Sequence, residues 1–354
     1  MCKMAEGKLP VTIVTGFLGS GKTTVLSHWL EHPMFQRVSV IVNEFGQAGL
    51  DQRVLRQIEE KTLLLSGGCA CCNIRDDLVR ELSAMIDSRD RGELDVDRVV
   101  IETTGLADPA PILFSIMTDS VLRHHYQVDC VVTCLDAVNG SFQLDHTKES
   151  VKQIATADKI LLTKTDLAEV SEIPALTERV LEINPSASIL RTDMGRIDPE
   201  LVFSEGVGRT DRPEVLQAMN TRPTIVLKRR HESLVRSISI GFSNTISWAA
   251  FGLWLSALLY AHGEKIYRVK GLLDTGEGGP VLINGVQHII HPPRHLEDWG
   301  GEERRSELVF IMKDIEPGII LDSLRAFQRI LGAQAHIREL NEDLSSISSA
   351  GGRA

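Results

Sequence analysis

The chain has 354 residues, of which 43% are hydrophobic and 24% are charged, the proportions of an ordinary globular protein with room for two domains. Its 48 acidic and 38 basic residues give a formal net charge of −10. This charge argues against general binding to nucleic acid or to an anionic membrane, because both need a basic face. The sequence has no apolar run near the roughly 18 residues that span a bilayer, and its N-terminus lacks a secretory cleavage pattern. We therefore expect a cytoplasmic protein whose thiols stay reduced.

The first half of the chain predicts a parallel β-sheet. Segments with helical patterns, such as 22–32 and 74–88, alternate with short runs rich in β-branched residues. These runs are nearly continuous in apolar residues, as strands buried on both faces should be, and they cover 11–15, 38–42, 98–102, 130–136 and 159–163. The alternation predicts a doubly wound, mostly parallel α/β domain over about residues 8–200.

The second half predicts a smaller α+β domain. A polar, turn-rich connector with one short helix precedes it, and we place this connector at 201–222. The domain itself is expected at 223–335, followed by a partly disordered tail at 336–354. Its predicted elements are strands at 237–242, 267–273, 280–290 and 307–314, an apolar helix at 246–263 and a last helix at 321–332.

The octapeptide GFLGSGKT, Gly16 to Thr23, fits the phosphate-loop pattern of two glycines five apart followed by lysine and a hydroxyl residue. It follows a predicted strand and opens a predicted helix, which is the context that gives the match meaning. Lys22 would reach the β- and γ-phosphates, and the Thr23 hydroxyl would ligate Mg²⁺. The pattern predicts a nucleoside triphosphate site formed by Gly16, Gly19, Ser20, Gly21, Lys22, Thr23 and Thr24.

The segment LLTKTDL predicts the base preference. Lys164 and Asp166 resemble the Asn-Lys-x-Asp guanine motif of GTPases, because an ionised Asp166 accepts from both the N1–H and the N2 amino group of guanine. Adenine offers neither donor and would leave the carboxylate unpaired. Thr163 departs from the pattern, which has asparagine there, so we expect a less firmly held loop and a weaker preference for GTP. The alternative for Asp166 is an ordinary helix cap.

Between these motifs, VVIETTGLADP ends a predicted strand with a carboxylate. Glu102 at a strand end facing the phosphate loop can hold Mg²⁺ through water or orient the attacking water. The Gly105 N–H could sense the γ-phosphate and move when it leaves, as in a GTPase switch. The sequence therefore predicts Lys22, Thr23 and Glu102 as the catalytic group.

The segment SGGCACCNIR places Cys69, Cys71 and Cys72 within four positions. A disulfide is disfavoured in the cytosol and would be strained between neighbouring cysteines, and the flanking glycines and charged residues disfavour core packing. Two or three thiolates on a turn suit Zn²⁺, Cu⁺ or another soft to borderline ion. A redox or purely structural role is the alternative.

Taken in order, the phosphate loop, NEFG (43–46), SGGCACCNIR, ETTGLADP and TKTD resemble the CobW-type GTPases, the family that includes zinc-regulated metalloprotein activators. The resemblance implies a P-loop GTPase of the SIMIBI class, with the smaller C-terminal domain of that family. It also implies that the C-x-C-C motif binds zinc or cobalt, and that GTP hydrolysis drives metal transfer to a client apoprotein. Glu44 would lie in a part of the chain that switches with the bound nucleotide, as a ligand of Mg²⁺ or of the transferred metal; a solvated carboxylate is the alternative.

Other cysteines and histidines are not assigned a site. Cys130 and Cys134 have the even spacing of one strand face and are expected to be buried. His288, His291 and His295 invite a secondary metal or client-sensing role, but the prolines between them preclude helical ligand spacing. The chain lacks the histidine-rich stretch that cobalt-delivering family members often carry, which favours zinc.

These observations predict a GTP-hydrolysing metallochaperone, a monomer or homodimer, that uses GTP/GDP, Mg²⁺ and Zn²⁺ and serves a client metalloprotein. A cobalt-delivering GTPase for cobalamin biosynthesis or nitrile-hydratase-type activation, with Co²⁺ as the metal, is one alternative. A P-loop ATPase or kinase with structural cysteines is a second. A metal sensor or store that binds nucleotide only to set its conformation is a third.

Overall fold

The computed structural model describes residues 7–42, 62–64, 73–203, 235–299 and 304–337. The chain divides into two compact units, one of residues 1–179 with 187–212 and the other of residues 180–186 with 213–354. Within the described ranges, no helix combines the length and apolar character needed to cross a membrane.

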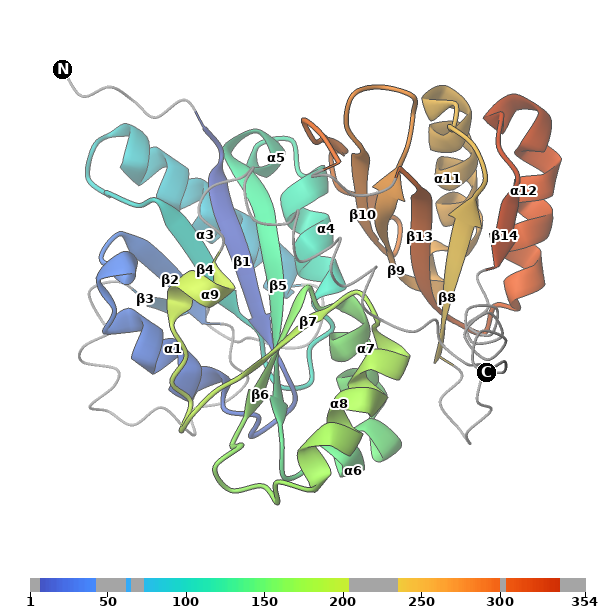
Figure 1. Cartoon of the computed structure of the whole chain (residues 1–354). Helices are drawn as coiled ribbons and strands as arrows, with labels where there is room; N and C mark the ends of the chain where they lie inside the picture. The colour runs from blue at the N-terminus through green and yellow to red at the C-terminus, as the bar shows by residue number, and fades with distance from the viewer. Residues whose placement is uncertain (1–6, 43–61, 65–72, 204–234, 300–303, 338–354) are drawn as a thin grey trace. The chain divides into compact units, whose positions relative to one another are not determined.

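The first unit alternates strands and helices along the chain (Figure 1). Its elements are β1 (Leu9–Thr15), α1 (Lys22–Leu30), η1 (Pro33–Phe35), β2 (Val38–Val42), β3 (Thr62–Leu64), α3 (Asn73–Asp90), β4 (Arg98–Glu102), α4 (Ala110–Thr118), α5 (Leu122–His125), β5 (Tyr126–Asp136), α6 (Gly140–His146), α7 (Lys148–Thr156), β6 (Lys159–Thr163), α8 (Glu172–Ile183), β7 (Ser188–Arg191) and α9 (Pro199–Val202).

All strand pairs of this unit are parallel, and among the described residues they form a seven-stranded sheet in the order β3-β2-β4-β1-β5-β6-β7. β1 lies between β4 and β5, and Val14 pairs with Glu102. Because parallel strands point the same way, the residues that follow β1, β4, β5 and β6 all leave the sheet at one edge. The sheet topology thus brings the sequence motifs to a common edge.

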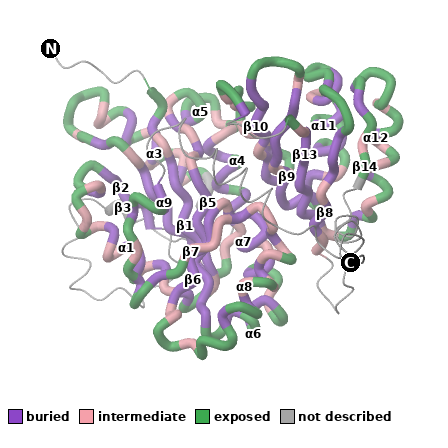
Figure 2. Tube along the Cα trace, viewed as in Figure 1, coloured by how far each residue is buried: buried purple, intermediate pink, exposed green. Residues whose placement is uncertain are grey.

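The strands β1, β2, β4, β5 and β6 are largely buried on both faces, which explains their continuous apolar runs (Figure 2). One face packs against α1, η1 and α9, where the rings of Trp29, Phe35 and Phe203 meet with centroids 4.8–5.9 Å apart. On the other face, the Tyr126 hydroxyl donates to the Leu82 carbonyl of α3 at 2.8 Å, and α4 and α7 pack on β5. The first unit is therefore a three-layer α/β sandwich.

The second unit contains a sheet with helices on one face. Its elements are β8 (Val235–Phe242), α11 (Trp248–His262), η2 (Gly263–Lys265), β9 (Ile266–Leu273), β10 (Val281–Val286), β11 (Ile289–Ile290), β12 (Arg294–His295), β13 (Ser306–Lys313), α12 (Pro317–Leu331) and β14 (Ala335–Ile337). The strands are antiparallel in the order β11-β10-β9-β13-β8-β14, with β12 paired to β10.

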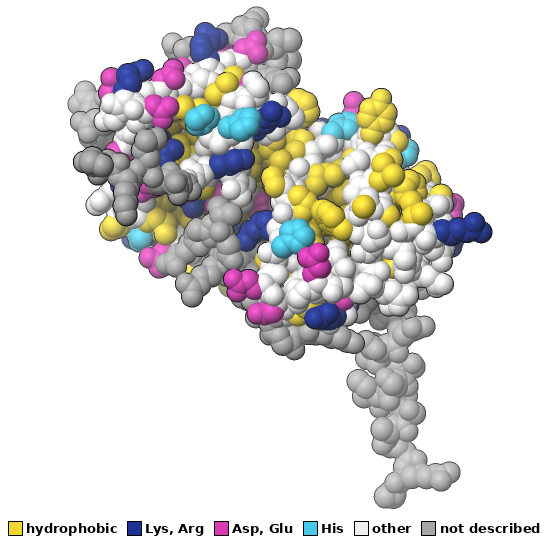
Figure 3. Space-filling model, turned by 90° about the horizontal axis from the view of Figure 1, so that it is seen from above, with side chains coloured by type: hydrophobic (Ala, Val, Ile, Leu, Met, Phe, Trp, Pro, Cys, Tyr) yellow, Lys and Arg dark blue, Asp and Glu magenta, His cyan; other side chains and the backbone are white. Residues whose placement is uncertain are grey.

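The core of the second unit lies between this sheet and the two helices α11 and α12. The Trp254 indole N–H donates to the Ser323 hydroxyl at 2.9 Å and so joins the two helices. Pro317 opens α12 and Gly332, at φ 78°, ends it in the left-handed conformation that glycine adopts without strain. In Figure 3, hydrophobic side chains gather on the surface of this unit, and the exposed side chains of Leu253 and Tyr260 on α11 contribute to its apolar surface.

The expected fold, a doubly wound, mostly parallel sheet followed by a smaller α+β domain, is confirmed. One predicted element is wrong: the run at 280–290 is a hairpin of β10 and β11, because Gln287 adopts φ 52° and turns the chain. The short strands β3, β7 and β14 were not predicted. Most of the predicted tail and most of the connector lie outside the described residues, but the first two residues of that tail, 336–337, belong to β14.

Candidate nucleotide-binding and GTPase site

The phosphate loop has the shape that an anion cradle requires. Gly16 has φ 140°, and a Cβ there would lie 2.3 Å from the Cys134 carbonyl oxygen, so only glycine fits. Gly21, at φ 86°, precedes the first turn of α1, whose N–H groups therefore face the loop. The Lys22 ammonium donates to the carbonyls of Gly16 at 2.8 Å and Phe17 at 3.1 Å. A buried lysine thus closes the loop from inside, where phosphate oxygens would be its other acceptors.

Thr23 in the first turn of α1 contacts Glu102, the last residue of β4. The Thr23 hydroxyl donates to Glu102 Oε1 at 3.0 Å, and the glutamate is 6% exposed. A hydroxyl and a carboxylate that converge next to a phosphate cradle are the hard oxygen donors that Mg²⁺ prefers. The two side chains therefore offer donors that fit a magnesium ion, the Thr23 hydroxyl and the Glu102 carboxylate.

The segment after β4 packs directly on the phosphate loop. A Cβ at Gly105 would lie 2.6 Å from the Leu18 backbone nitrogen and 2.7 Å from its Cα, so a side chain cannot be accommodated without moving backbone. This close approach places the Gly105 peptide beside the loop that would hold the phosphates. The geometry suits a backbone N–H that responds to a γ-phosphate.

Thr163 takes the place in which guanine-binding loops usually have asparagine. Its hydroxyl lies 2.7 Å from the Ser20 carbonyl and 3.2 Å from the Leu135 carbonyl, and the side chain is 2% exposed. The hydroxyl therefore ties the end of β6 to the phosphate loop. A threonine can thus hold the loop through an oxygen–oxygen hydrogen bond.

Lys164 follows Thr163 in the left-handed conformation, at φ 55°. Its ammonium forms a 2.7 Å ion pair with Asp136 at the end of β5. Burial raises the pKa of Asp136, but hydrogen bonds from Asn139, from Lys164 and from two backbone amides outweigh that effect and hold this pKa below its ordinary value. Asp136 is therefore an ionised anchor for the lysine, while Asp166 is exposed and open to a base.

A tight turn lies beside these residues. The Thr165 hydroxyl donates to the Thr192 carbonyl at 2.6 Å, and Asp193 and Arg196 form an isolated β-bridge. Gly195 in this turn lies against Thr24 of α1, because a Cβ on the glycine would be 2.8 Å from Thr24 Cγ2. The turn thus closes the space between the end of β6 and α1.

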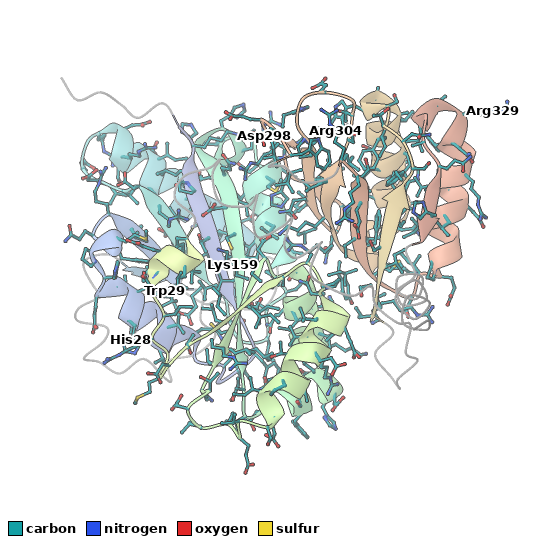
Figure 4. All side chains as sticks on the ribbon, viewed as in Figure 1. His28, Trp29, Lys159, Asp298, Arg304 and Arg329 are labelled. Atoms are coloured by element: carbon teal, nitrogen blue, oxygen red, sulfur yellow. The ribbon has the colours of Figure 1, made fainter. Side chains whose placement is uncertain are left out.

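The elements after the turn are fixed to the same face of the sheet. The Lys159 ammonium donates to the Leu201 carbonyl of α9 at 3.2 Å, and the Arg98 guanidinium lies 5.0 Å from the centre of the Phe203 ring. Figure 4 shows Lys159 near the middle of the unit and Trp29 on α1. These contacts hold the 192–203 segment in place.

Five predicted positions need separate mention. Cys69, Cys71, Cys72 and Glu44 lie outside the described residues. Gly19 is described and adopts φ 72° within the phosphate loop. The strand ends that precede these positions in the chain are described: Val42 pairs with Leu64 and with Glu102. Val42 and Leu64, which precede the sequence segments of Glu44 and of the cysteines, thus both lie at the edge of the sheet that carries Glu102.

The two cysteines of β5 are buried, as expected. Cys130 and Cys134 lie on one face of β5 and are not joined in a disulfide. Burial raises the pKa of the Cys134 thiol to about 12, although the nearby Lys22 charge acts in the opposite direction. Such a thiol stays protonated and is a poor nucleophile or metal ligand.

The histidines 288, 291 and 295 do not converge. His288 Nδ1 lies 2.9 Å from the Leu259 carbonyl, whereas His295 lies 3.8 Å from a Glu277 carboxylate oxygen. Within the described part of the chain, no group of three or more histidine, cysteine or acidic side chains is placed to hold a metal.

Sequence reasoning missed three features of the site. Asp136 carried a local signal, an acidic residue at the end of a buried strand run. The 192–196 turn also carried one, the turn-forming residues TDMG, but no site was predicted there. Gln153 of α7, whose amide donates to the carbonyls of Gly105 and Ala107, had no local signal because its partners are distant in sequence.

The parallel sheet, the phosphate loop and the Thr23–Glu102 pair together define a P-loop nucleoside triphosphatase. The family described as CobW/HypB/UreG, nucleotide-binding domain, matches residues 10–191, and the cobalamin synthesis protein cobW C-terminal domain matches residues 235–328. The chain belongs to the CobW family, and it is a GTPase. The resemblance given by the motifs is thereby confirmed.

Known relatives cover most of the chain. The zinc chaperone YjiA of Escherichia coli is 33% identical over 304 residues, which are 86% of this chain and 93% of YjiA. Zinc-regulated GTPase metalloprotein activator 1 of Schizosaccharomyces pombe is 30% identical over 348 residues. The match covers 88% of this chain and 82% of the activator. The crystal structure of Zn(II)-bound YjiA matches with a TM-score of 0.70 and 30% identity. The match covers 91% of this chain and 99% of the YjiA chain. A YjiA triple mutant, with one glutamate and two adjacent cysteines changed to alanine, is also described as Zn(II)-bound, at the same TM-score of 0.70.

Proposed function

We propose that this protein is a metallochaperone that binds zinc through its C-x-C-C motif and releases it to a client metalloprotein under the control of GTP hydrolysis. The observation that carries the proposal is the common strand edge, where the Thr23–Glu102 pair lies beside the two strand ends that lead into the segments of Glu44 and the cysteines. Reduced thiols would be available to the metal in the cytosol, where we expect the protein to act.

The hydrolytic roles follow from the geometry of the edge. The Lys22 ammonium exchanges a carbonyl of the phosphate loop for oxygens of the β- and γ-phosphates. Thr23 and Glu102 hold Mg²⁺, which when bound neutralises charge that develops on the phosphate oxygens. Gly105, packed on Leu18, contacts the γ-phosphate through its N–H. Residues contributed by the phosphate loop to nucleotide binding include Gly16, Gly19, Ser20, Gly21 and Thr24.

Guanine is selected at the end of β6. The exposed Asp166 carboxylate accepts from the N1–H and N2 groups of the base, and Lys164 lines the ring while its ammonium is held by Asp136. Thr163 keeps this loop tied to the phosphate loop. A bound base removes the Asp166 carboxylate from water, and adenine would leave that carboxylate without a hydrogen-bond donor. ATP therefore binds more weakly than GTP.

The metal is the cargo of this reaction. Cys69, Cys71 and Cys72 supply thiolates, which suit Zn²⁺, and Glu44 supplies a harder oxygen ligand that is lost when the switch moves. Relatives named as zinc chaperones support zinc over cobalt. Once Glu44 has left, the three thiolates leave one coordination position open, so a client ligand can enter before the cysteines release the ion.

A competitive chelator titration of Zn²⁺ and Co²⁺ tests this proposal. We would measure metal affinity and stoichiometry without nucleotide, with Mg²⁺–GDP and with a non-hydrolysable GTP analogue. The wild-type affinity should differ between the two nucleotide states by about 5- to 150-fold, and metal should change nucleotide affinity by the same factor. In a Cys71→Ser, Cys72→Ser variant, the nucleotide-dependent ion should be lost, whereas the buried Cys130→Ala control should keep it.

Stoichiometry matters because the YjiA triple mutant is still described as Zn(II)-bound, so a residual second ion would not contradict the proposal. Wild-type affinity in the double-cysteine variant would exclude the C-x-C-C site. Tighter binding of Co²⁺ than of Zn²⁺ would favour the cobalt-delivering alternative. Equal affinity for ATP and GTP would favour an ATPase or kinase, and negligible hydrolysis in the presence of metal and client would favour a sensor.

A further inference from the structure

The four residues Gly105 to Asp108, here named the switch segment, are held from the side by helix α7. The Gln153 amide nitrogen lies 3.2 Å from the Gly105 carbonyl and 3.1 Å from the Ala107 carbonyl. The next residue toward the N-terminus, Lys152, forms a 3.2 Å ion pair with Asp108. Two adjacent residues of one helix thus contact three of the four residues of the segment.

The Gln153 backbone is a rigid support for these contacts. Its carbonyl accepts hydrogen bonds from the Thr133 hydroxyl of β5 at 2.9 Å and from the Thr156 hydroxyl at 3.2 Å. The side chain itself is 1% exposed. The Gln153 main chain is therefore anchored to β5 of the central sheet, and its side-chain amide holds the switch segment relative to that sheet.

Stability alone does not explain a glutamine here. Burial of a primary amide is unfavourable unless both of its polar atoms are paired, and Gln153 Oε1 has no hydrogen-bond partner among the described residues. An apolar side chain would avoid that unpaired acceptor. What the glutamine adds is a donor aimed at two carbonyls of the switch segment, one of them that of the glycine packed on Leu18.

We propose that Gln153 is a positioning residue that holds Gly105 against the phosphate loop and thereby sets how well the protein distinguishes GTP from GDP. This inference rests on the proposed contact of the Gly105 N–H with the γ-phosphate. Without the Gln153 amide, the Gly105 peptide must be ordered when GTP binds, so GTP loses affinity. GDP lacks the γ-phosphate and makes no such demand, so its affinity stays unchanged.

The test compares Gln153→Met with Gln143→Met in the full-length protein. Both glutamines are buried, but Gln143 lies on α6, and its main-chain carbonyl accepts from Thr147. We would measure the affinities for fluorescent GDP and for a fluorescent non-hydrolysable GTP analogue with Mg²⁺ and without zinc, together with kcat and KM for GTP. For Gln153→Met we expect a GTP-to-GDP affinity ratio lowered by at least about fivefold, with GDP affinity within twofold of the wild type.

An unchanged ratio in Gln153→Met, or an equal change in Gln143→Met, would overturn the inference. If Gln153→Met does not fold, the half-exposed Lys152→Met variant serves in its place: a ratio lowered by about twofold supports the inference, and an unchanged ratio overturns it. Because no zinc is present, failure of the metal-transfer proposal would leave this result unaffected. A wild-type protein that binds both nucleotides equally would instead remove the proposed role of Gly105.

Discussion

Replacement of Thr163 by valine tests whether the base loop is tied to the phosphate loop by one hydroxyl. Valine keeps the shape of threonine and removes the hydrogen bond to the Ser20 carbonyl at 2.7 Å. The net loss of a hydrogen bond is about 0.5–1.5 kcal/mol, and an acceptor left unpaired in a buried place raises the loss to roughly 1–3 kcal/mol. We therefore expect the melting temperature to fall by about 2–4 °C per kcal/mol lost.

The same change should weaken nucleotide binding without altering the choice between GDP and GTP. Both nucleotides contact the base loop and the phosphate loop, so about 1 kcal/mol of lost ordering lowers both affinities by about fivefold. Calorimetric unfolding and titration with fluorescent GDP and GTP analogues would measure the two effects. The matched control is Thr12→Val, a buried threonine of β1 whose hydroxyl accepts from Arg98 at 3.0 Å.

Thr12→Val should lose stability but keep nucleotide affinity, since Thr12 lies within the strand and does not contact the loop. Wild-type nucleotide affinity in Thr163→Val would refute the idea that the Thr163 hydroxyl holds the base loop to the phosphate loop. So would an equal loss of affinity in Thr12→Val, because the effect would then come from general destabilisation of the sheet. A change in the GTP-to-GDP ratio would show that Thr163 acts on the γ-phosphate, contrary to our reasoning.

Three further predictions follow from the site. Gly105→Ala should destabilise the protein by about 1–3 kcal/mol and lower kcat for GTP at least tenfold while GDP binding persists, because its Cβ would meet the Leu18 backbone at 2.6 Å; wild-type kcat would contradict the close packing. Asp136 has a lowered pKa, so its stabilising effect is full above its ordinary pKa of 3.8 and is lost as the pH falls below it. Urea unfolding of wild type and Asp136→Asn should therefore differ at pH 6, and the difference should shrink as the pH falls below 3.8; a difference that does not shrink there would exclude an electrostatic origin. Cys134, whose pKa is raised to about 12, should resist a thiol reagent at pH 8 until the protein unfolds, as peptide mass spectrometry would show; equal labelling before and after unfolding would contradict its burial.

The elements that the sequence predicted best are those with a strong local cause. Strands buried on both faces have continuous apolar runs, and β1, β2, β4, β5 and β6 were found within a few residues of the predicted ranges. Short edge elements lack such a run. β3 and β7 exist because a neighbouring strand offers unpaired backbone groups, and the hairpin of β10 and β11 depends on one residue, Gln287, in the left-handed conformation.

The phosphate loop was predictable because its chemistry is local: glycines, a lysine and a hydroxyl must be adjacent to surround a phosphate. The base loop was only partly predictable. The sequence indicated that Thr163 would hold the loop poorly, since threonine lacks the amide of asparagine. Which atom the hydroxyl reaches depends on how closely β6 approaches β1, and that distance is set by β5 between them.

The sequence by itself determined the class of site, the order of its motifs and the kinds of ligand that those motifs accept, because each motif is a short run whose residue types carry the chemistry. Tertiary structure alone decided which distant side chains support the site. Asp136 holds Lys164 and Gln153 holds the switch segment only because parallel strands end at one edge and α7 packs on β5, so no local pattern in the chain could have paired them.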